Sequence, residues 1–212
     1  MRNKYTEKLE QLNNEMIEMG TMVEKAIEDA VVAFINHDVE AAQKIIEADD
    51  NIDKKEKEIE NICFKLILHQ QPVAGDLREI STALKMVTDI ERIGDHAADI
   101  SELTMMMPGD KYMGKAEHIS AMTKETIFML VESINAFVDM DKEKAEEVIK
   151  HDDIVDGLFV KVKKELIELI HSDVNNGEQA VDLLLAAKYL ERIGDHAENV
   201  SEWVTYSITG ER

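Results

Sequence analysis

The sequence predicts an all-α protein built from two tandem three-helix bundles, and three observations support this prediction. Aromatic residues make up only 5% of the 212 residues and there are 2 prolines, which is poor material for a β-sandwich or barrel. Apolar residues recur at the three- and four-residue spacing of a helix through long stretches. The third observation is an internal repeat, because ERIGDHA occurs at 91–97 and again at 191–197.

Breaks in the apolar pattern divide the chain into six long helices. Pro72 and Gly75 interrupt the pattern once, and Pro108, Gly109 and Gly114 interrupt it again. Helices of about 30 residues far exceed the usual mean of about 11 to 12, and such lengths are typical of bundles. We expect helices near 4–36, 39–70, 77–106, 115–139, 142–173 and 177–207.

Several polar residues are candidate caps for the helix N-termini. Asp38 and Asp141 each follow one apolar stretch and precede the next, where a carboxylate can accept a hydrogen bond from a free helix N–H. Two pairs have the spacing of a capping box: Asp76 with Glu79 and Asn176 with Gln179.

The internal repeat extends well beyond its most obvious motif. AQKIIEADDNID at 42–53 matches AEEVIKHDDIVD at 145–156, so helices outside the ERIGDHA segments are repeated as well. A unit of about 100 residues with three long helices can fold as one bundle. We therefore predict two three-helix units, at 1–107 and 108–212.

The composition excludes several classes of function. The net charge of −21, from 45 acids against 24 bases, argues against binding to nucleic acid or to an anionic membrane surface. The single cysteine, Cys63, excludes an internal disulfide framework and a Cys-based zinc site. No apolar run approaches the roughly 18 to 20 residues of a membrane span, and the first residues lack an apolar signal core. We expect a cytoplasmic protein.

Pairs of acids at i, i+4 spacing lie at the border of the apolar stripe on four of the predicted helices. If four carboxylates converge between two helices, each pair about 4 Å apart repels by roughly 4 kcal/mol at an effective dielectric near 20. Carboxylate-only clusters suit hard cations such as Mg²⁺, Ca²⁺, Mn²⁺ or iron. The alternative is that these acids pair with Lys and Arg across helices. The candidate metal ligands are Asp49, Asp53, Glu91, Asp95, Asp152, Asp156, Glu191 and Asp195.

Each ERIGDHA segment also places a glycine and a histidine beside these acids. Gly94 and Gly194 lie in mid-helix, where glycine costs roughly 1 kcal/mol relative to alanine. Their recurrence between Glu and Asp indicates a close approach of a neighbouring helix or an ion. We expect His96 and His196 to lie outside the ligand set.

Two segments carry a resemblance to a known family. HQQPVAGDLREISTALKMVTDIERIGDHAADI and YLERIGDHAENVSEW resemble the signature of the PhoU family of phosphate-signalling regulators, and the resemblance covers essentially the whole chain. It implies two tandem three-helix bundles related by a pseudo-two-fold axis, assembled as a homodimer. It also implies multinuclear metal clusters at the eight acids above, with iron or zinc; divalent Mg or Mn is possible as well.

The resemblance further implies a regulator rather than an enzyme. Such a protein is a metal-binding adaptor that contacts the ATPase subunit of a phosphate ABC transporter and a sensor histidine kinase. It restrains phosphate uptake and keeps the phosphate-starvation response off when phosphate is plentiful. Related proteins serve other phosphate transporters, which is one alternative here.

The two repeats differ at three acidic positions, which predicts a first cluster richer in ligands. Where the first unit has Glu56, Asp89 and Asp99, the second has Phe159, Tyr189 and Asn199.

Two other functions compete with the regulator. A phosphohydrolase using a carboxylate-bridged metal pair is the first. The sequence shows no general base or phosphate-binding Arg cluster beside the acids, since Arg92 and Arg192 are expected to project elsewhere. Ion storage is the second, but ferritin-like bundles use Glu-x-x-His pairs, which are missing beside these acids.

Overall fold

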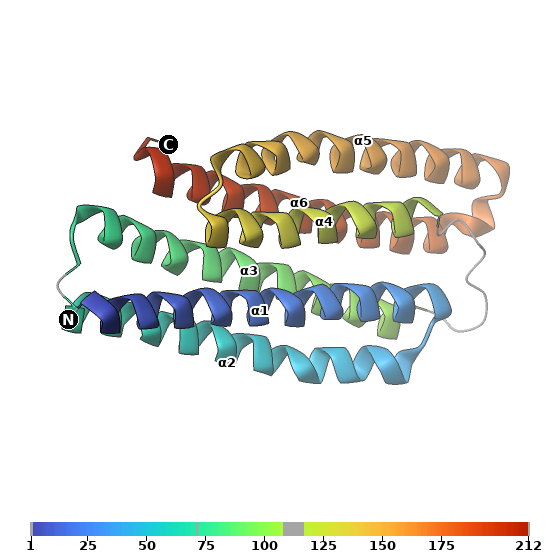
Figure 1. The fold of residues 1–212 in the computed structure, drawn as a ribbon. Helices are drawn as coiled ribbons and strands as arrows, with labels where there is room; N and C mark the ends of the chain where they lie inside the picture. Colours follow the sequence, from blue (N-terminus) through green and yellow to red (C-terminus); the bar gives the residue numbers. More distant parts are fainter. Residues whose placement is uncertain (1, 71, 108–116, 212) are drawn as a thin grey trace.

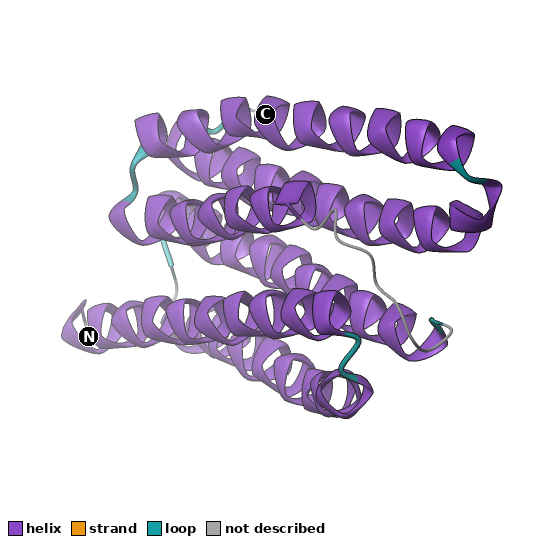
Figure 2. Ribbon diagram, turned by 90° about the vertical axis from the view of Figure 1, so that its right-hand side faces the viewer, coloured by secondary structure: helices purple, strands orange, loops and turns teal. Residues whose placement is uncertain are grey.

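A computed structural model describes residues 2–70, 72–107 and 117–211 of the chain. Within these ranges the protein is helical, with short connections and no strand (Figure 2). The expected start of the fourth helix at 115 lies outside the described residues. The elements are α1 (Arg2–Asn36), α2 (Val39–Gln70), α3 (Ala74–Met106), α4 (Glu117–Asp139), α5 (Lys142–Ser172), the short 3-10 helix η1 (Val174–Asn176) and α6 (Gly177–Thr209).

The helices form two antiparallel three-helix bundles lying side by side (Figure 1). Helices α1, α2 and α3 pack together as the first bundle, and α4, α5 and α6 pack together as the second. The bundles meet through α3 against α6 and α1 against α4, so α2 and α5 lie on the outside (Figure 1). The predicted all-α fold is confirmed.

One apolar core runs through both bundles. Phe34 and Phe137, which occupy equivalent places in the repeat, are both fully buried in it. Truncating a buried phenylalanine to alanine costs about 3–5 kcal/mol, so each of these residues is a major contributor to stability. None of the described helices has a stretch apolar enough to cross a membrane.

The first two helices of each bundle are joined by the same turn. His37 and Met140 have φ angles of 52° and 51°, in the left-handed region that ends many helices. The N–H groups of Asp38 and Asp141 then donate to carbonyls five residues earlier, at 2.8 and 2.9 Å. The two side chains cap the next helix, accepting bonds of 2.9 and 3.0 Å from backbone N–H groups three residues on. Both predicted caps are confirmed.

The two predicted capping boxes are wrong. Helix α3 begins earlier than expected, with Val73 as its N-cap, so Asp76 lies in the first turn and accepts from the Val73 N–H at 3.4 Å. Asn176 makes no side-chain cap bond because it ends the 3-10 helix. Asp173 caps the 3-10 helix η1 that precedes α6, and its side chain accepts from the Asn175 N–H at 2.9 Å.

Candidate metal centres

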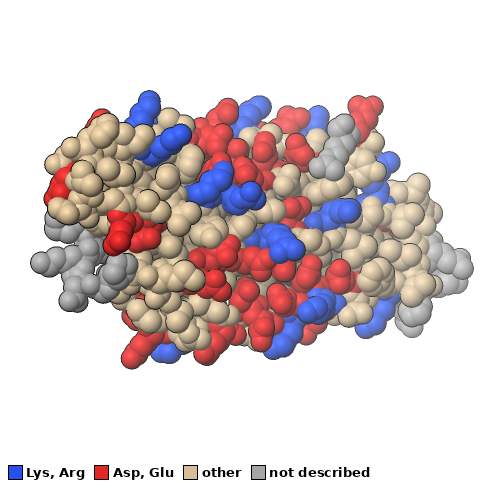
Figure 3. Space-filling model, turned by 180° about the vertical axis from the view of Figure 1, so that it is seen from behind, with Lys and Arg blue, Asp and Glu red and all other residues tan. Residues whose placement is uncertain are grey.

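The candidate ligands gather in two carboxylate clusters, one in each bundle. The first cluster lies between α2 and α3, and the second lies between α5 and α6. On the face opposite to that of Figure 1, Asp and Glu side chains concentrate in two regions, over these two helix pairs, with Lys and Arg between them (Figure 3). Acidic side chains thus gather in two regions of one face of the protein.

Three acids of the first cluster converge. Asp49, Asp53 and Asp95 are half-buried, and each offers a carboxylate oxygen such that these atoms lie within 4.8 Å of one another. Among the described residues, this trio is the one group of His, Cys, Asp or Glu side chains that comes so close together. Two of its members come from α2 and one from α3, so a cation held there would connect the two helices.

Proton affinities in the first cluster reflect burial and mutual repulsion. Burial, followed by the charges of Asp95 and Asp53, raises the pKa of Asp49 to about 6. Burial and the Asp95 charge raise the pKa of Glu91 to about 7, although Arg92 lowers it. Cations would relieve this repulsion.

The prediction that the first cluster has additional acids is correct for one of the three positions and wrong for another. Glu56 contributes to the raised pKa of Glu91, and its carboxylate accepts from the Thr88 hydroxyl at 3.3 Å. Asp89 lies away from the cluster, 2.9 Å from His196 Nδ1 of the second bundle. Asp99 lies at the edge of the first cluster, because its charge contributes least among the groups that raise the pKa of Asp49.

Arg92 does not project away from the acids, and this part of the prediction is wrong. Its guanidinium lies 2.6 Å from Asp95 and 3.6 Å from Glu91. A wheel places the Cβ of Arg92 on another side of the helix, but the long, flexible side chain bends back to the neighbouring turn. The alternative to metal binding is that the acids pair with Lys and Arg across helices. Asp95 and Glu91 do pair with a basic residue, but that residue lies on their own helix.

The second cluster is looser. Burial, then the charges of Glu198, Asp156 and Asp195, raises the pKa of Asp152 to about 7. Burial and the Glu191 charge raise the pKa of Asp195, while Lys188 lowers it. Asp156 is exposed, unlike its half-buried counterpart in the first cluster.

Two residues that sequence reasoning missed belong to the second cluster. Glu198 lies on the same face as Asp195, and the i, i+3 spacing between them was a usable signal. Lys188 donates to Glu191 and lies over the Phe159 ring, 5.5 Å from its centroid. Lys188 also lies three residues before Glu191, but no sequence signal indicated which basic residue would pair with the acids.

The two mid-helix glycines allow the neighbouring helix to approach, as predicted. A Cβ at Gly94 would lie 3.1 Å from Ile52 and 3.5 Å from Asp49 Oδ1. A Cβ at Gly194 would lie 3.1 Å from Asp152 Oδ1 and 3.3 Å from Val155. The absence of a side chain thus brings the acids of one helix close to the backbone of the other.

The histidines lie at the contact between the bundles, outside the close trio. The rings of His96 and His196 face each other across α3 and α6, with centroids 5.6 Å apart. His96 Nδ1 lies 3.0 Å from Asp99, and its ring is 5.8 Å from that of Tyr189. Repetition of the motif did not reveal this pairing, because it depends on how the two bundles dock.

The donor set of the first cluster fits hard cations. Asp49, Asp53 and Asp95 offer half-buried carboxylate oxygens, the ligands that Mg²⁺, Ca²⁺, Mn²⁺ and iron prefer, and the Arg92 guanidinium pairs with one of them, Asp95. Cys63, the one thiol, is buried in the core. Asp49, Asp53 and Asp95 are the residues that would hold a cation, with Glu91 and Glu56 nearby.

Comparison with known proteins gives consistent results for the whole chain. The family model described as the PhoU domain matches twice, at residues 16–104 and 119–204. A phosphate-specific transport system accessory protein PhoU homolog from Clostridium acetobutylicum is 42% identical over 96% of this chain and 94% of its own length. The Escherichia coli protein with the PhoU name is 29% identical over 98% of this chain and 86% of its own length.

Solved structures give the same result. The crystal structure of PhoU from Pseudomonas aeruginosa matches with a TM-score of 0.88 and 32% identity, covering 98% of this chain and 100% of that one. The phosphate transport system regulatory protein PhoU from Streptococcus pneumoniae matches with a TM-score of 0.88 and 26% identity, covering 98% of both chains.

Proposed function

The chain belongs to the PhoU family, and on this premise we propose that it is an accessory protein of a phosphate-specific transport system. In this proposal it is a negative regulator, which restrains phosphate uptake and the phosphate-starvation response when phosphate is plentiful. The observation that carries the proposal is the similarity of the chain to phosphate-specific transport system accessory proteins. This similarity extends over both repeats and is not confined to one of them.

The protein is proposed to act in the cytoplasm by docking rather than by catalysis. Its partners are the ATPase subunit of the phosphate transporter and the cytoplasmic part of a sensor histidine kinase. A net charge of −21 favours basic patches on these partners, with binding that weakens as salt rises. We propose a homodimer, for which light scattering should give about 48 kDa, twice the 24.1 kDa of the chain.

Cations at the carboxylate clusters are proposed to serve the regulator structurally. When bound, they supply positive charge that neutralises the acids and a link between two helices. The chain's own residues then hold those helices in one relative position, which shapes the surface presented to a partner. The proposed ligands are the eight acids of the two clusters, with the convergent trio as the principal site.

Deleting the gene tests the regulatory role. We expect starvation genes to be expressed in phosphate-rich medium, and phosphate uptake to rise, because the restraint is lost. Complementation with the intact gene should restore both. A deletion that leaves expression and uptake unchanged would refute the proposal, and uptake altered through a different phosphate transporter would identify that transporter as the partner.

A carboxylate-cluster metalloenzyme is the second candidate, and the position of Arg92 favours it. A guanidinium beside hard-cation ligands is suited to binding a phosphoryl group. Hydrolysis of p-nitrophenyl phosphate by the Mn²⁺-loaded protein tests this candidate. Turnover that is lost in both Arg92→Ala and Asp95→Asn would support a phosphohydrolase, and activity indistinguishable from buffer would exclude it for this substrate.

A further inference from the structure

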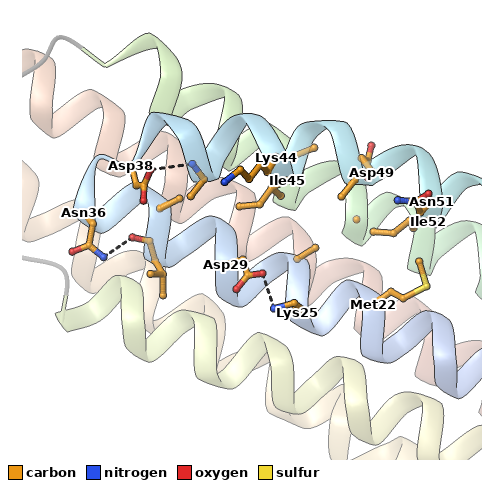
Figure 4. Close-up of a pocket in the computed structure, with 17 residues that line it drawn as sticks. Met22, Lys25, Asp29, Asn36, Asp38, Lys44, Ile45, Asp49, Asn51 and Ile52 are labelled. Carbon is orange, nitrogen blue, oxygen red and sulfur yellow. Dashed lines mark hydrogen bonds and ion pairs between the residues drawn. The ribbon is translucent and has the colours of Figure 1, made fainter.

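An open groove lies between α1 and α2 of the first bundle (Figure 4). Its volume is about 500 Å³, within the range of about 300–1,000 Å³ that is usual for ligand sites. Most of its surface is apolar, and small residues from three helices keep it open. We call it the α1–α2 groove; its main lining residues are Met22, Ala33, Ile45, Ala48, Ile52 and Gly94.

The groove is elongated along the helices. Its labelled residues run from Asn36 and Asp38 at one end to Met22 and Ile52 at the other (Figure 4). From Asp38 to Ile52, α2 rises by about 21 Å at 1.5 Å per residue. This length matches a partner helix of about four turns lying in the groove, which is a common mode of peptide recognition.

The second bundle has two ring side chains at positions that line the groove in the first bundle. The counterparts of Lys25 and Ala48 are Phe128 and His151, whose rings pack together with centroids 4.6 Å apart. In the first bundle, alanine stands at position 48, so the ring that His151 provides in the second bundle is missing. The side chain of Lys25 is 74% exposed and pairs with Asp29 at 2.9 Å, so it leaves the groove open. The same helical frame therefore accommodates a pair of rings in one repeat and lacks them in the other.

Charge at the groove favours a basic occupant. Asp38 lies near one end and Asp49, a member of the first carboxylate cluster, near the other (Figure 4). Asp29 neutralises Lys25, which leaves Lys44 as the other basic residue of the lining. A second copy of this chain, with a net charge of −21, is a poor occupant because it would bring further negative charge.

We infer that the α1–α2 groove is a docking site for a basic amphipathic helix of a partner protein. The apolar side chains of that helix, an aromatic ring among them, occupy the space over Ala48 and Ile52, and a Lys or Arg lies close to Asp38, an acid of the lining that belongs to neither carboxylate cluster. The inference rests on the proposed function, because it names the surface through which the regulator contacts one of its partners. In the described part of the second repeat, the Phe128 and His151 rings stand at the equivalent positions, so we expect the two repeats to have different roles.

A labelled peptide provides a direct test. The probe is a fluorescent amphipathic peptide of about 18 residues made of Leu, Lys and one Trp, titrated with chelator-treated protein at physiological salt. The double variant Lys25→Phe/Ala48→His copies the second repeat into the groove and should weaken binding at least about tenfold. Because this variant makes the chain more negative, purely electrostatic association would not weaken. Unchanged affinity would overturn the inference.

A mirror variant gives a gain-of-function control. Phe128→Lys/His151→Ala removes the two rings from the second bundle and should create a second peptide site per chain. If Lys25→Phe/Ala48→His loses its helical circular dichroism, Ala48→His alone replaces it. A benzophenone in place of the peptide's Trp then maps the site, and crosslinking to Met22 supports the groove. Crosslinks confined to other helices would refute it.

The same variant separates this inference from the proposed function in cells. A deletion strain complemented with Lys25→Phe/Ala48→His should remain derepressed if the groove binds the partner. If deletion derepresses the starvation genes but this variant restores repression, the regulatory role stands and the groove has no part in it. If deletion itself has no effect, the proposed function fails, and the peptide titration still decides whether the groove binds a helix.

Discussion

The two carboxylate clusters come from the same repeated motif, but their surroundings differ at two equivalent positions. In the first cluster, Thr88 donates to Glu56, which adds an acid near the candidate ligands. In the second, Lys188 occupies the position of Thr88 and donates to Glu191, and Phe159 replaces Glu56 beneath the ammonium group. At these two positions the second cluster thus has a cation and the first an additional anion, while Arg92 pairs with Asp95 and Glu91 in the first cluster.

This contrast separates what the motif provides from what its neighbours provide. The i, i+4 acids and the mid-helix glycine are common to both repeats, and they bring carboxylates between two helices. The neighbouring residues then decide whether those carboxylates converge, as Asp49, Asp53 and Asp95 do, or whether one stays exposed, as Asp156 does. We expect the first cluster to bind hard cations more tightly than the second.

The largest effect is expected from removing a member of the convergent trio. Asp95→Asn should weaken Mn²⁺ binding to the first cluster by at least about 100-fold, because an amide cannot supply the negative charge. Asp195→Asn should have a smaller effect on total binding. Isothermal titration and metal analysis measure both, with Glu47→Gln, an exposed acid of α2, as the control. Equal losses in the two variants would contradict the asymmetry.

Exchanging the surroundings should exchange the affinities. Lys188→Thr/Phe159→Glu removes a cation from the second cluster and adds an acid, so its Mn²⁺ affinity should rise by about tenfold. Thr88→Lys/Glu56→Phe should lower that of the first cluster similarly. Titrations in the Asp95→Asn and Asp195→Asn backgrounds report one cluster at a time. If the Mn²⁺ affinities of the two clusters stay unchanged in these variants, the difference between the clusters comes from helix geometry instead.

The pH dependence of stability should reveal the repulsion in the clusters. The pKa of Asp49 is about 6 and the pKa values of Glu91 and Asp152 are about 7, against about 4 in an unfolded chain. The folded state therefore binds more protons between about pH 4 and pH 7, and its stability falls as pH rises through this window and then levels off.

In chelator, we expect the melting temperature to drop by a few degrees, about 3 °C or more, between pH 5 and pH 7.5. Asp49→Asn and Asp152→Asn should each flatten the profile, and saturating Mn²⁺ should abolish the drop. A melting temperature that rises over this pH range would mean that basic groups in the folded state outweigh the repulsion between the acids.

The smallest effects are expected at the two glycines. Alanine gains about 1 kcal/mol in helix propensity, which offsets the displacement of a neighbour, so Gly94→Ala and Gly194→Ala should change the melting temperature little. They should differ in metal binding. The new Cβ would displace Ile52 in the first cluster but the Asp152 carboxylate in the second. Calorimetric titration should therefore show weaker Mn²⁺ binding for Gly194→Ala and unchanged binding for Gly94→Ala. If both variants bind Mn²⁺ more weakly, the distance between the two helices determines how the carboxylates are placed.

Local patterns allowed much of this protein to be predicted from its sequence. Apolar periodicity predicted six helices, and Asp38 and Asp141 were identified as caps because a cap needs only the residues next to it. The paired acids and the glycines between them were likewise found from spacing along one helix. These features depend on a few consecutive residues, so they can be read before the chain is folded.

Tertiary packing decided the rest. The convergence of the trio depends on the separation of α2 and α3, and the contact of His96 with His196 depends on how two bundles dock. The α1–α2 groove also exists only between helices. Distances between side chains on different helices follow from packing of the whole core, and no single segment of the sequence specifies them.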